Sequence, residues 1–180
     1  MYHLDTPVLE TERLVLHAPQ LADWEPLAAF LSSARAQYVG GPLSRDRAWR
    51  GFGHLVGHWV LRGYGMFFVT PKGADTAIGM VGPWFPEGWP EQEIGWSMFA
   101  PEAEGQGYAF EAAIAAKAHV FADLGWKTAV SYIDPANARS IALAQRLGAT
   151  FDPDAAKVAG EEMVVYRHRA PLNPALGALA

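Results

Sequence analysis

A glycine-rich segment between a strand-like run and a helical pattern constrains this chain more than any other feature. The segment, Pro101–Ala109, reads P-E-A-E-G-Q-G-Y-A and follows the apolar run Ile94–Phe99, which ends the expected strand 92–99. A turn of this kind leaves backbone N–H groups unpaired at the positive end of a helix dipole, where a phosphate binds favourably. Gly105 and Gly107 permit close approach of the backbone, and Ala109 keeps the first helical turn narrow. The segment therefore predicts an anion site, most simply for a pyrophosphate.

Two common phosphate motifs are excluded by the residues around this turn. The P-loop pattern G-x-x-x-x-G-K-[ST] is absent, because no Lys-Ser or Lys-Thr pair follows a suitable glycine. A dinucleotide fingerprint that starts at Gly105 needs its third glycine at position 110, where Phe110 stands. The turn therefore does not match a nucleotide-binding P-loop or a dinucleotide-binding fingerprint, and a different kind of phosphate ligand is expected.

Strands and helices alternate along the chain, which predicts an α/β domain. We expect strands over 13–17, 66–70, 77–85, 92–99, 128–133 and 163–168, and helices over 23–31, 45–62, 107–124 and 137–148. The strand before the glycine turn, its helix and the strand 128–133 form a βαβ unit, so these two strands should be adjacent and parallel. The order of elements predicts one mixed, twisted sheet of about seven strands with helices on both faces.

Composition sets the class of protein. The 180 residues, 51% hydrophobic and 18% charged, are expected to form a single domain over 1–180, with a loosely held tail at 171–180. The net charge of −5 argues against a nucleic-acid surface, and the absence of cysteine excludes disulfides and thiolate metal sites. The N-terminus does not read as a signal peptide, and no apolar run is long enough to cross a bilayer. We therefore expect a cytoplasmic protein with no membrane partner.

Three blocks of the sequence carry a resemblance to one family. The run E-G-Q-G-Y-A at 104–109 resembles the acyl-CoA loop Q/R-x-x-G-x-G/A of the GNAT acetyltransferases, and the longer run 94–112 resembles the branch with the ribosomal-protein N-terminal acetyltransferases. The block Asn137–Gly148 is similar to that branch's N-x-x-S…L-G element, and Glu10–Leu16 resembles its usual first strand. The resemblance implies a GNAT fold, with one N-acetyltransferase domain over 9–170. It further implies acetyl-CoA as co-substrate, no metal, and a small-molecule or peptide amine as acceptor.

The resemblance also implies which residues contact acetyl-CoA. In the family, the two central strands splay apart and the pantetheine arm lies between them. By this analogy, the cofactor-binding residues are Met98, Phe99, Glu104, Gly105, Gln106, Gly107, Tyr108, Ala109, Asn137 and Ser140. Asn137 and Ser140 have a second interpretation as a helix N-cap and first turn. Because the glycine loop is also present and the family uses these two positions to contact the CoA arm, we favour that role over capping.

Catalysis needs a proton acceptor, because an amine of pKa about 10 is mostly protonated at neutral pH. Similar enzymes often place a carboxylate on the strand before the loop, which makes Glu93 the candidate base; its alternative role is a solvated strand residue. The backbone N–H of Met98 is the candidate oxyanion donor. Many family members carry a tyrosine acid in the later helix, but the corresponding stretch here, 143–149, has none. Either Ser140 is the acid near the sulfur, or the thiolate leaves without a dedicated acid.

Glu104 departs from the family pattern, which has Gln or Arg at this position. A carboxylate beside a pyrophosphate is unfavourable by Coulomb repulsion. Together with the missing tyrosine, this leaves a second hypothesis, a non-catalytic acyl-CoA-binding or sensing domain on the same fold.

Other signals leave more than one interpretation open. Trp84, Phe85, Trp89 and Trp96 fit the lining of an acceptor pocket, where a ring stacks on a cation, as well as core packing or a homodimer contact. His54 and His58 have an i, i+4 spacing that suits a metal. Because no third ligand is evident, we expect an ordinary helix face there and no metal site.

Overall fold

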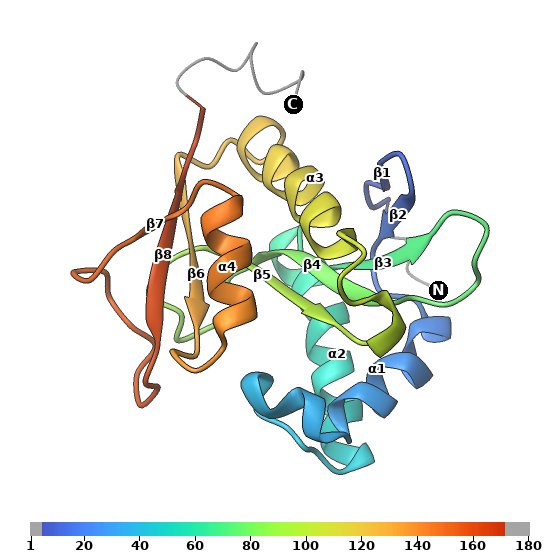
Figure 1. Ribbon diagram of the computed structural model, residues 1–180. Helices are drawn as coiled ribbons and strands as arrows, with labels where there is room; N and C mark the ends of the chain where they lie inside the picture. The colour runs from blue at the N-terminus through green and yellow to red at the C-terminus, as the bar shows by residue number, and fades with distance from the viewer. Residues whose placement is uncertain (1–4, 172–180) are drawn as a thin grey trace.

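The computed structural model describes residues 5–171, which form one eight-stranded sheet in the order β1-β2-β3-β4-β5-β6-β8-β7 (Figure 1). The strands are β1 (Leu9–Glu10), β2 (Leu14–His17), β3 (Phe67–Pro71), β4 (Gly79–Trp84), β5 (Glu93–Met98), β6 (Thr128–Ile133), β7 (Thr150–Phe151) and β8 (Val164–Arg169). Only β5 and β6 pair in parallel; every other neighbouring pair is antiparallel. The expected adjacent, parallel pair on either side of the glycine loop is confirmed.

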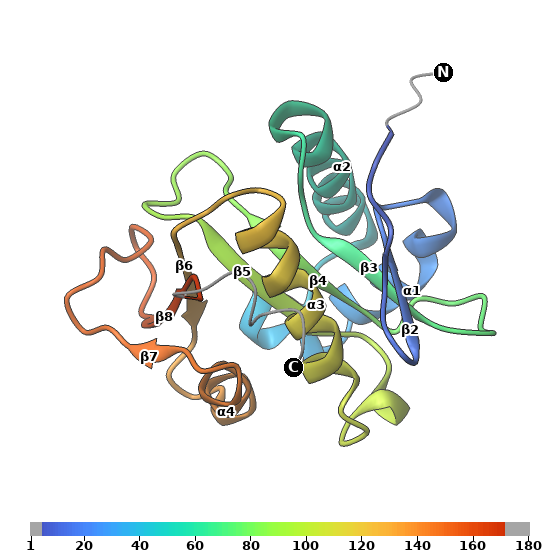
Figure 2. The same ribbon diagram turned by 90° about the horizontal axis from the view of Figure 1, so that it is seen from above.

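Four α-helices cover the sheet: α1 (Trp24–Leu31), α2 (Arg45–Arg62), α3 (Tyr108–Ala122) and α4 (Ala138–Arg146). Short 3-10 helices occur at η1 (Leu21–Asp23), η2 (Ala34–Val39) and η3 (Pro101–Ala103). Figure 2 shows α2 on one side of the sheet and α3 and α4 on the other, while α1 packs against α2. Helices therefore cover both faces, as expected.

Two strands were not expected from the sequence. The sheet has eight strands rather than about seven, because β1 and β7 add pairs of two residues each. A two-residue strand is too short to show a period-2 pattern, so only its neighbour in the sheet defines it. The loosely held tail proposed for 171–180 lies outside the described residues from position 172 onward.

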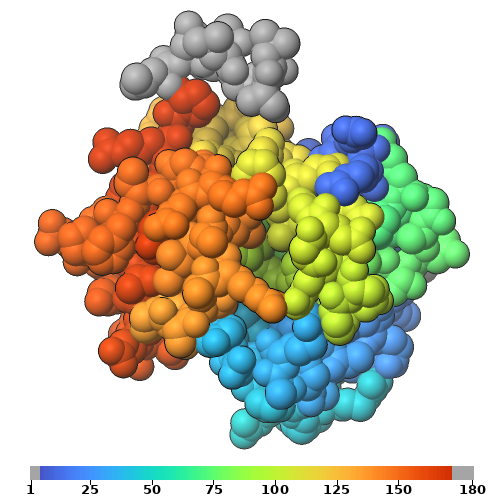
Figure 3. Space-filling view, viewed as in Figure 1, coloured from blue at the N-terminus to red at the C-terminus, as the bar shows by residue number. Residues whose placement is uncertain are grey.

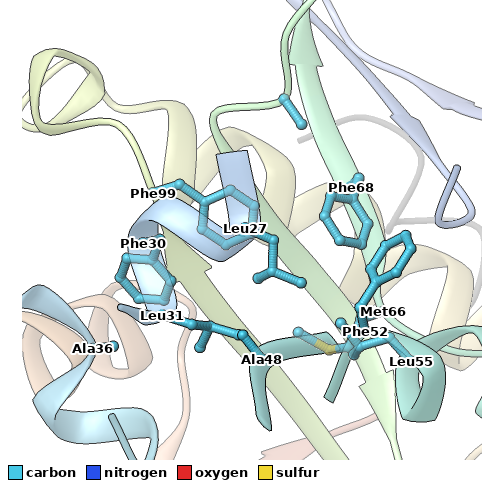
Figure 4. Packing of buried hydrophobic residues seen from close by; sticks show 11 residues of the cluster. Leu27, Phe30, Leu31, Ala36, Ala48, Phe52, Leu55, Met66, Phe68 and Phe99 are labelled. Atoms are coloured by element: carbon cyan, nitrogen blue, oxygen red, sulfur yellow. The ribbon is translucent and has the colours of Figure 1, made fainter. Parts of the chain in front are cut away.

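The two sheet faces build two different cores. On the α3 side, Leu14, Leu16, Phe67 and Val69 pack against three alanines of α3, whose small side chains bring the helix close to the strands. On the other side, Phe68 joins residues of α1 and α2 in a larger aromatic and aliphatic cluster (Figure 4). Phe67 and Phe68 are adjacent yet face opposite cores, which is the period-2 alternation of a strand buried on both faces. None of the helices within residues 5–171 combines the length and the apolar composition needed to span a bilayer.

Candidate active site

A gap opens between β5 and β6 at the centre of the sheet. The two strands share one residue pair, Glu93 with Val130, next to a hydrogen bond from the Val130 N–H to the Gln92 carbonyl at 2.9 Å. Beyond that pair the strands run on as 94–98 and 131–133 without further pairing, and Figure 1 shows them diverging. The Phe99 N–H donates to the Ile78 carbonyl on the β4 side, so by alternation the backbone groups of Met98 face the gap. The predicted oxyanion donor therefore lies on the gap side.

The glycine loop ends where α3 begins. Gly107 is the N-cap residue of α3 and has no side chain to cap the first-turn N–H groups. Gly105 and Gly107 adopt φ values of +74° and +81°, which side chains rarely tolerate. A Cβ at Gly105 would meet no atom within 4 Å, and one at Gly107 would meet only the Arg13 guanidinium, at 3.5 Å. The glycines are therefore required first by backbone conformation, and the uncapped helix start suits an anion.

Arg13 fixes this loop, although the sequence analysis did not single it out. Its Nη1 donates to the Gln106 carbonyl at 3.0 Å, and its Nη2 pairs with Glu111 at 2.6 Å. Its guanidinium also lies over the Tyr108 ring, 4.5 Å from the centroid. Arg13 and Gln106 are 93 positions apart, so no local pattern could have indicated the contact.

Glu104 is paired on two sides. Its carboxylate lies 2.6 Å from Arg35 of η2 and also pairs with Arg139 of α4. The Arg35 and Arg139 guanidinium groups hold the pKa of Glu104 below its usual range, mainly through the hydrogen bond from Arg35. The two guanidinium groups offset the repulsion expected between this carboxylate and a pyrophosphate. The pair with Arg139 links the segment after β5 to the helix after β6, across the indentation visible in Figure 3 between the yellow and orange residues.

Glu93 lies at the base of the gap and is buried, not solvated. The residue is 9% exposed, and the Trp89 Nε1 donates to its carboxylate at 2.6 Å. Burial raises the pKa of Glu93 to about 7, against the opposing effect of hydrogen bonds from Trp89 and from the Tyr132 backbone N–H. A buried carboxyl with a pKa near neutrality is suited to accept a proton.

Asn137 and Ser140 lie at the start of α4. The Asn137 side chain accepts from the Ser140 N–H at 3.2 Å, so the capping interpretation describes a contact that is present. The Ser140 hydroxyl in turn accepts from the Trp96 Nε1 at 3.2 Å, which ties α4 to β5. Contact of Asn137 and Ser140 with the CoA arm stays a prediction.

The four predicted pocket aromatics do not form one cluster. Trp84 stacks on His58 at 4.5 Å, and Phe85 lies under the Arg62 guanidinium at 5.0 Å. Trp89 packs against the residues around Val130 on β6, whereas Trp96 packs towards α3 and α4 on the other face. Trp89 and Trp96 flank the base of the gap from its two faces. A joint role for the four in acceptor binding stays a prediction.

The His58 imidazole uses both of its nitrogens within the protein. Its Nε2 accepts from the Phe85 N–H at 3.0 Å, so its Nδ1 carries the proton and donates to the Tyr64 carbonyl at 2.7 Å. Across residues 5–171, no group of three or more His, Asp or Glu side chains is placed to hold a metal ion.

Comparison with known families agrees with this geometry. Residues 13–150 match the family model described as acetyltransferase (GNAT) domain. The chain belongs to the GNAT acetyltransferase family. It is accordingly an acetyl-CoA-dependent acetyltransferase, and the alternative of a non-catalytic domain loses its support.

Solved GNAT structures resemble the chain over nearly its full length. An acetyltransferase from Agrobacterium tumefaciens shares 36% identity, with 94% of this chain and 98% of that chain covered at a TM-score of 0.86. A candidate ribosomal-protein-serine acetyltransferase from Vibrio cholerae shares 25% identity at a TM-score of 0.74, with 93% and 99% covered. RimL, a ribosomal L7/L12 alpha-N-protein acetyltransferase solved with coenzyme A, shares the fold at 17% identity and a TM-score of 0.72, with 91% and 98% covered.

The residues of this GNAT domain fit acetyl-CoA by their own chemistry. The uncapped start of α3 offers backbone N–H groups to a pyrophosphate. The β6 side of Met98 offers backbone polar groups to an amide-containing arm, as the edge of a sheet does to an added strand. Both features lie at the carboxyl end of β5.

Proposed function

We propose that this GNAT enzyme transfers the acetyl group of acetyl-CoA to a primary amine, with Glu93 as the general base. The observation that carries the proposal is the position of Glu93. It is a buried carboxyl with a pKa of about 7 at the residue pair where β5 and β6 part. The glycine loop and the backbone of Met98 are suited to bind acetyl-CoA, whereas Glu93, at the base of the gap, is suited to accept a proton.

The chemistry assigns each residue a separate task. Acetyl-CoA, when bound, supplies an acyl group activated as a thioester. Glu93 takes a proton from the acceptor amine, directly or through one water, so that the nitrogen lone pair becomes available for the new C–N bond. A base of pKa about 7 accepts this proton more readily than an ordinary carboxylate of pKa 4.5, yet is still ionised in part at neutral pH. The Met98 N–H, on the gap side of β5, is the candidate donor to negative charge on the reacting carbonyl oxygen, and Ser140 is the candidate donor to the departing sulfur.

The acceptor is proposed as a class, a primary amine on a peptide N-terminus or on a small molecule. The sequence resemblance to the ribosomal-protein branch favours a peptide, and the net charge of −5 is compatible with a cationic acceptor. The indole rings of Trp89 and Trp96 beside the gap are suited to contact such a group.

The test is thiol release from acetyl-CoA over a panel of amines that includes peptides with N-terminal Ser and Ala, amino acids and polyamines. On any accepted amine, Glu93→Gln should lower turnover by about 100-fold or more while acetyl-CoA affinity is kept. The wild-type rate should rise with pH through about 7, and the variant should lose that ionisation. Glu87→Gln, an exposed residue of the loop before β5, is the matched control and should keep full activity.

Full activity of Glu93→Gln on a verified substrate would refute its role as base. If Glu87→Gln lost activity instead, the base would be that loop carboxylate. If no amine supported thiol release, amine transfer itself would be refuted.

A further inference from the structure

Ser131 is a buried polar residue in the middle of β6, between Val130 and Tyr132. The residue is 2% exposed, and its hydroxyl lies 2.6 Å from the Ile94 carbonyl of β5 and 3.0 Å from the His168 Nε2 of β8. A carbonyl can only accept, so the single hydroxyl proton of Ser131 is donated to Ile94. His168 must then donate its Nε2 proton to the Ser131 oxygen, which orients the hydroxyl towards β5.

The Ile94 carbonyl is the group that would continue the sheet. In a parallel ladder that pairs Glu93 with Val130, the next hydrogen bond joins the Ile94 carbonyl to the Tyr132 N–H. The structure has no such pair, because the two strands share one residue pair only. The hydroxyl of Ser131 occupies the carbonyl in place of the Tyr132 N–H.

The Tyr132 N–H that is left over is used by the catalytic site. It lowers the pKa of Glu93, and the indole N–H of Trp89 donates to the same carboxylate at 2.6 Å. One rung of the sheet is therefore replaced by the Ser131 hydrogen bond, and the Tyr132 N–H is left to act on Glu93. The strands part at the position where this exchange occurs.

We propose that Ser131, oriented by His168, is a positioning residue that holds β5 and β6 apart at the base of the gap and thereby leaves the Tyr132 N–H free to bind Glu93. The proposal rests on the proposed function of Glu93 but concerns different residues. Without the hydroxyl, the buried Ile94 carbonyl has no donor, and the nearest substitute is the Tyr132 N–H. Taking that N–H would extend the ladder, shorten the gap and remove a donor that stabilises the Glu93 anion.

The charged groups near Ser131 are already paired or neutral, so a change in the pKa of Glu93 on substitution of Ser131 would not come from them. On the Tyr132 side, Glu91 and Arg167 pair with each other at 2.7 Å. On the His168 side, the nearby cation is Lys117, whose Nζ donates to the Leu147 carbonyl at 2.6 Å. His168 is fully buried and burial lowers its pKa to about 4, so it stays neutral wherever Glu93 titrates.

The experiment compares Ser131→Ala, Ser131→Thr and Ser131→Cys. Acetyl-CoA affinity is measured by calorimetry, and the pH dependence of kcat/KM is measured on an amine accepted by the wild type. Ser131→Ala should weaken acetyl-CoA binding about tenfold, the scale of one strand hydrogen bond that binding must then break. It should also move the rate-controlling ionisation to higher pH. Ser131→Thr keeps the hydroxyl and should restore both properties, and Ser131→Cys, a weaker donor of similar size, should lie between them.

Wild-type affinity and an unmoved ionisation in Ser131→Ala would overturn the proposal. Equal losses in folded Ser131→Thr and Ser131→Ala would also overturn it, because size rather than the hydroxyl would then matter; Ser131→Cys answers the same question if the threonine variant does not fold. The binding measurement needs no turnover. Ser131-dependent acetyl-CoA binding without thiol release on any amine would therefore support the positioning role while refuting amine transfer.

Discussion

Strand β5 has two edges that differ in nearly every respect. Along β4, all six of its residues are paired, from Glu93 with Trp84 to Met98 with Gly79. Along β6, only Glu93 is paired. On that open edge, side chains replace the missing strand partners, since Ile94 accepts from Ser131 and the Met98 carbonyl accepts from Arg35 at 3.4 Å. The comparison shows that one strand can hold a sheet together and open a binding gap when polar side chains satisfy its free backbone groups.

The largest expected effect is a loss of stability on the side of β5 where the sheet is fully paired, the side of β4 and β3. Phe68 of β3 is fully buried between Phe52 and Phe99, with ring centroids at 6.2 and 5.8 Å. Phe68→Ala should lower the free energy of unfolding by about 3–5 kcal/mol, because it removes a large side chain from a packed core. Acetyl-CoA affinity of the folded protein should stay unchanged, since the open edge is untouched.

Urea unfolding measures the first quantity and calorimetry the second. Phe151→Ala is the control, because that ring is 55% exposed and should contribute far less. Equal losses in the two variants, or weakened binding by folded Phe68→Ala, would remove the distinction between the edges.

The second effect is the pH dependence of stability that comes from Glu93, the residue of β5 that is paired with both neighbouring strands. The pKa of Glu93 is raised from 4.5 to about 7 in the native state, so the native state binds this proton more tightly than the unfolded chain. The stability that the protonated carboxyl contributes is fully present below pH 4.5 and is lost as the pH rises through about 7. Between pH of about 4 and 8, the wild type should lose about 3 kcal/mol relative to Glu93→Gln, which does not titrate.

Chemical denaturation of both proteins at several pH values gives this difference directly. Two curves that run parallel between these pH values would show that burial at the base of the gap does not perturb the carboxyl.

The third effect concerns acetyl-CoA binding at the glycine loop, between the end of β5 and the start of α3. Acetyl-CoA should raise the melting temperature of the wild type by mass action, and Gly107→Val should remove most of that rise. The reason is the φ of +81°, which a β-branched residue can hardly adopt, so the start of α3 must rearrange. Gly73→Val is the matched control, because Gly73 has a φ of +83° in the turn after β3, away from the loop.

Both variants should be destabilised, but only Gly107→Val should lose the response to acetyl-CoA. A full response in Gly107→Val, measured by thermal denaturation, would place the CoA site elsewhere on the molecule.

The smallest effect concerns the ion pairs that Glu104 makes beside the glycine loop. Glu104 neutralises Arg35 and Arg139, two cations beside the proposed phosphate site. Glu104→Gln should free both guanidinium groups and tighten acetyl-CoA binding by roughly threefold at low salt, with the gain fading at high salt because exposed charges are screened. Glu102→Gln removes the same charge from the exposed residue two positions earlier and should have a smaller effect. Weaker binding by Glu104→Gln in calorimetry would mean instead that the ion pairs hold the loop in shape.

Much of the fold could be predicted because its signals are local. Helix α2 begins after Ser44 and ends before Gly63, which has the left-handed φ of a helix terminator, and both residues stand in the sequence where the pattern changes. Strand β6 covers the expected 128–133 without correction. The two-residue strands β1 and β7 could not be predicted, since two residues carry no periodicity and only pairing defines them.

The candidate site divides in the same way. The glycine loop was visible because its residues are consecutive, and Glu93 was named by resemblance. The partners of these residues were not visible, because Arg13 and Gln106 are 93 positions apart and Glu104 and Arg139 are 35 positions apart. Ser131 carried a weak signal, a polar residue inside an apolar strand, but its significance depends on two other strands.

The linear pattern of residues is enough to predict an α/β chain with a glycine-rich loop, and its motifs indicate the GNAT family to which the chain belongs. Turn, helix and strand preferences arise between near neighbours, so a linear pattern carries them. Packing between distant segments sets which charges pair, which edge of β5 stays open and how deeply Glu93 is buried. A pKa near 7 comes from the removal of water by residues distant in sequence, and desolvation is a property of the assembled surfaces rather than of any segment.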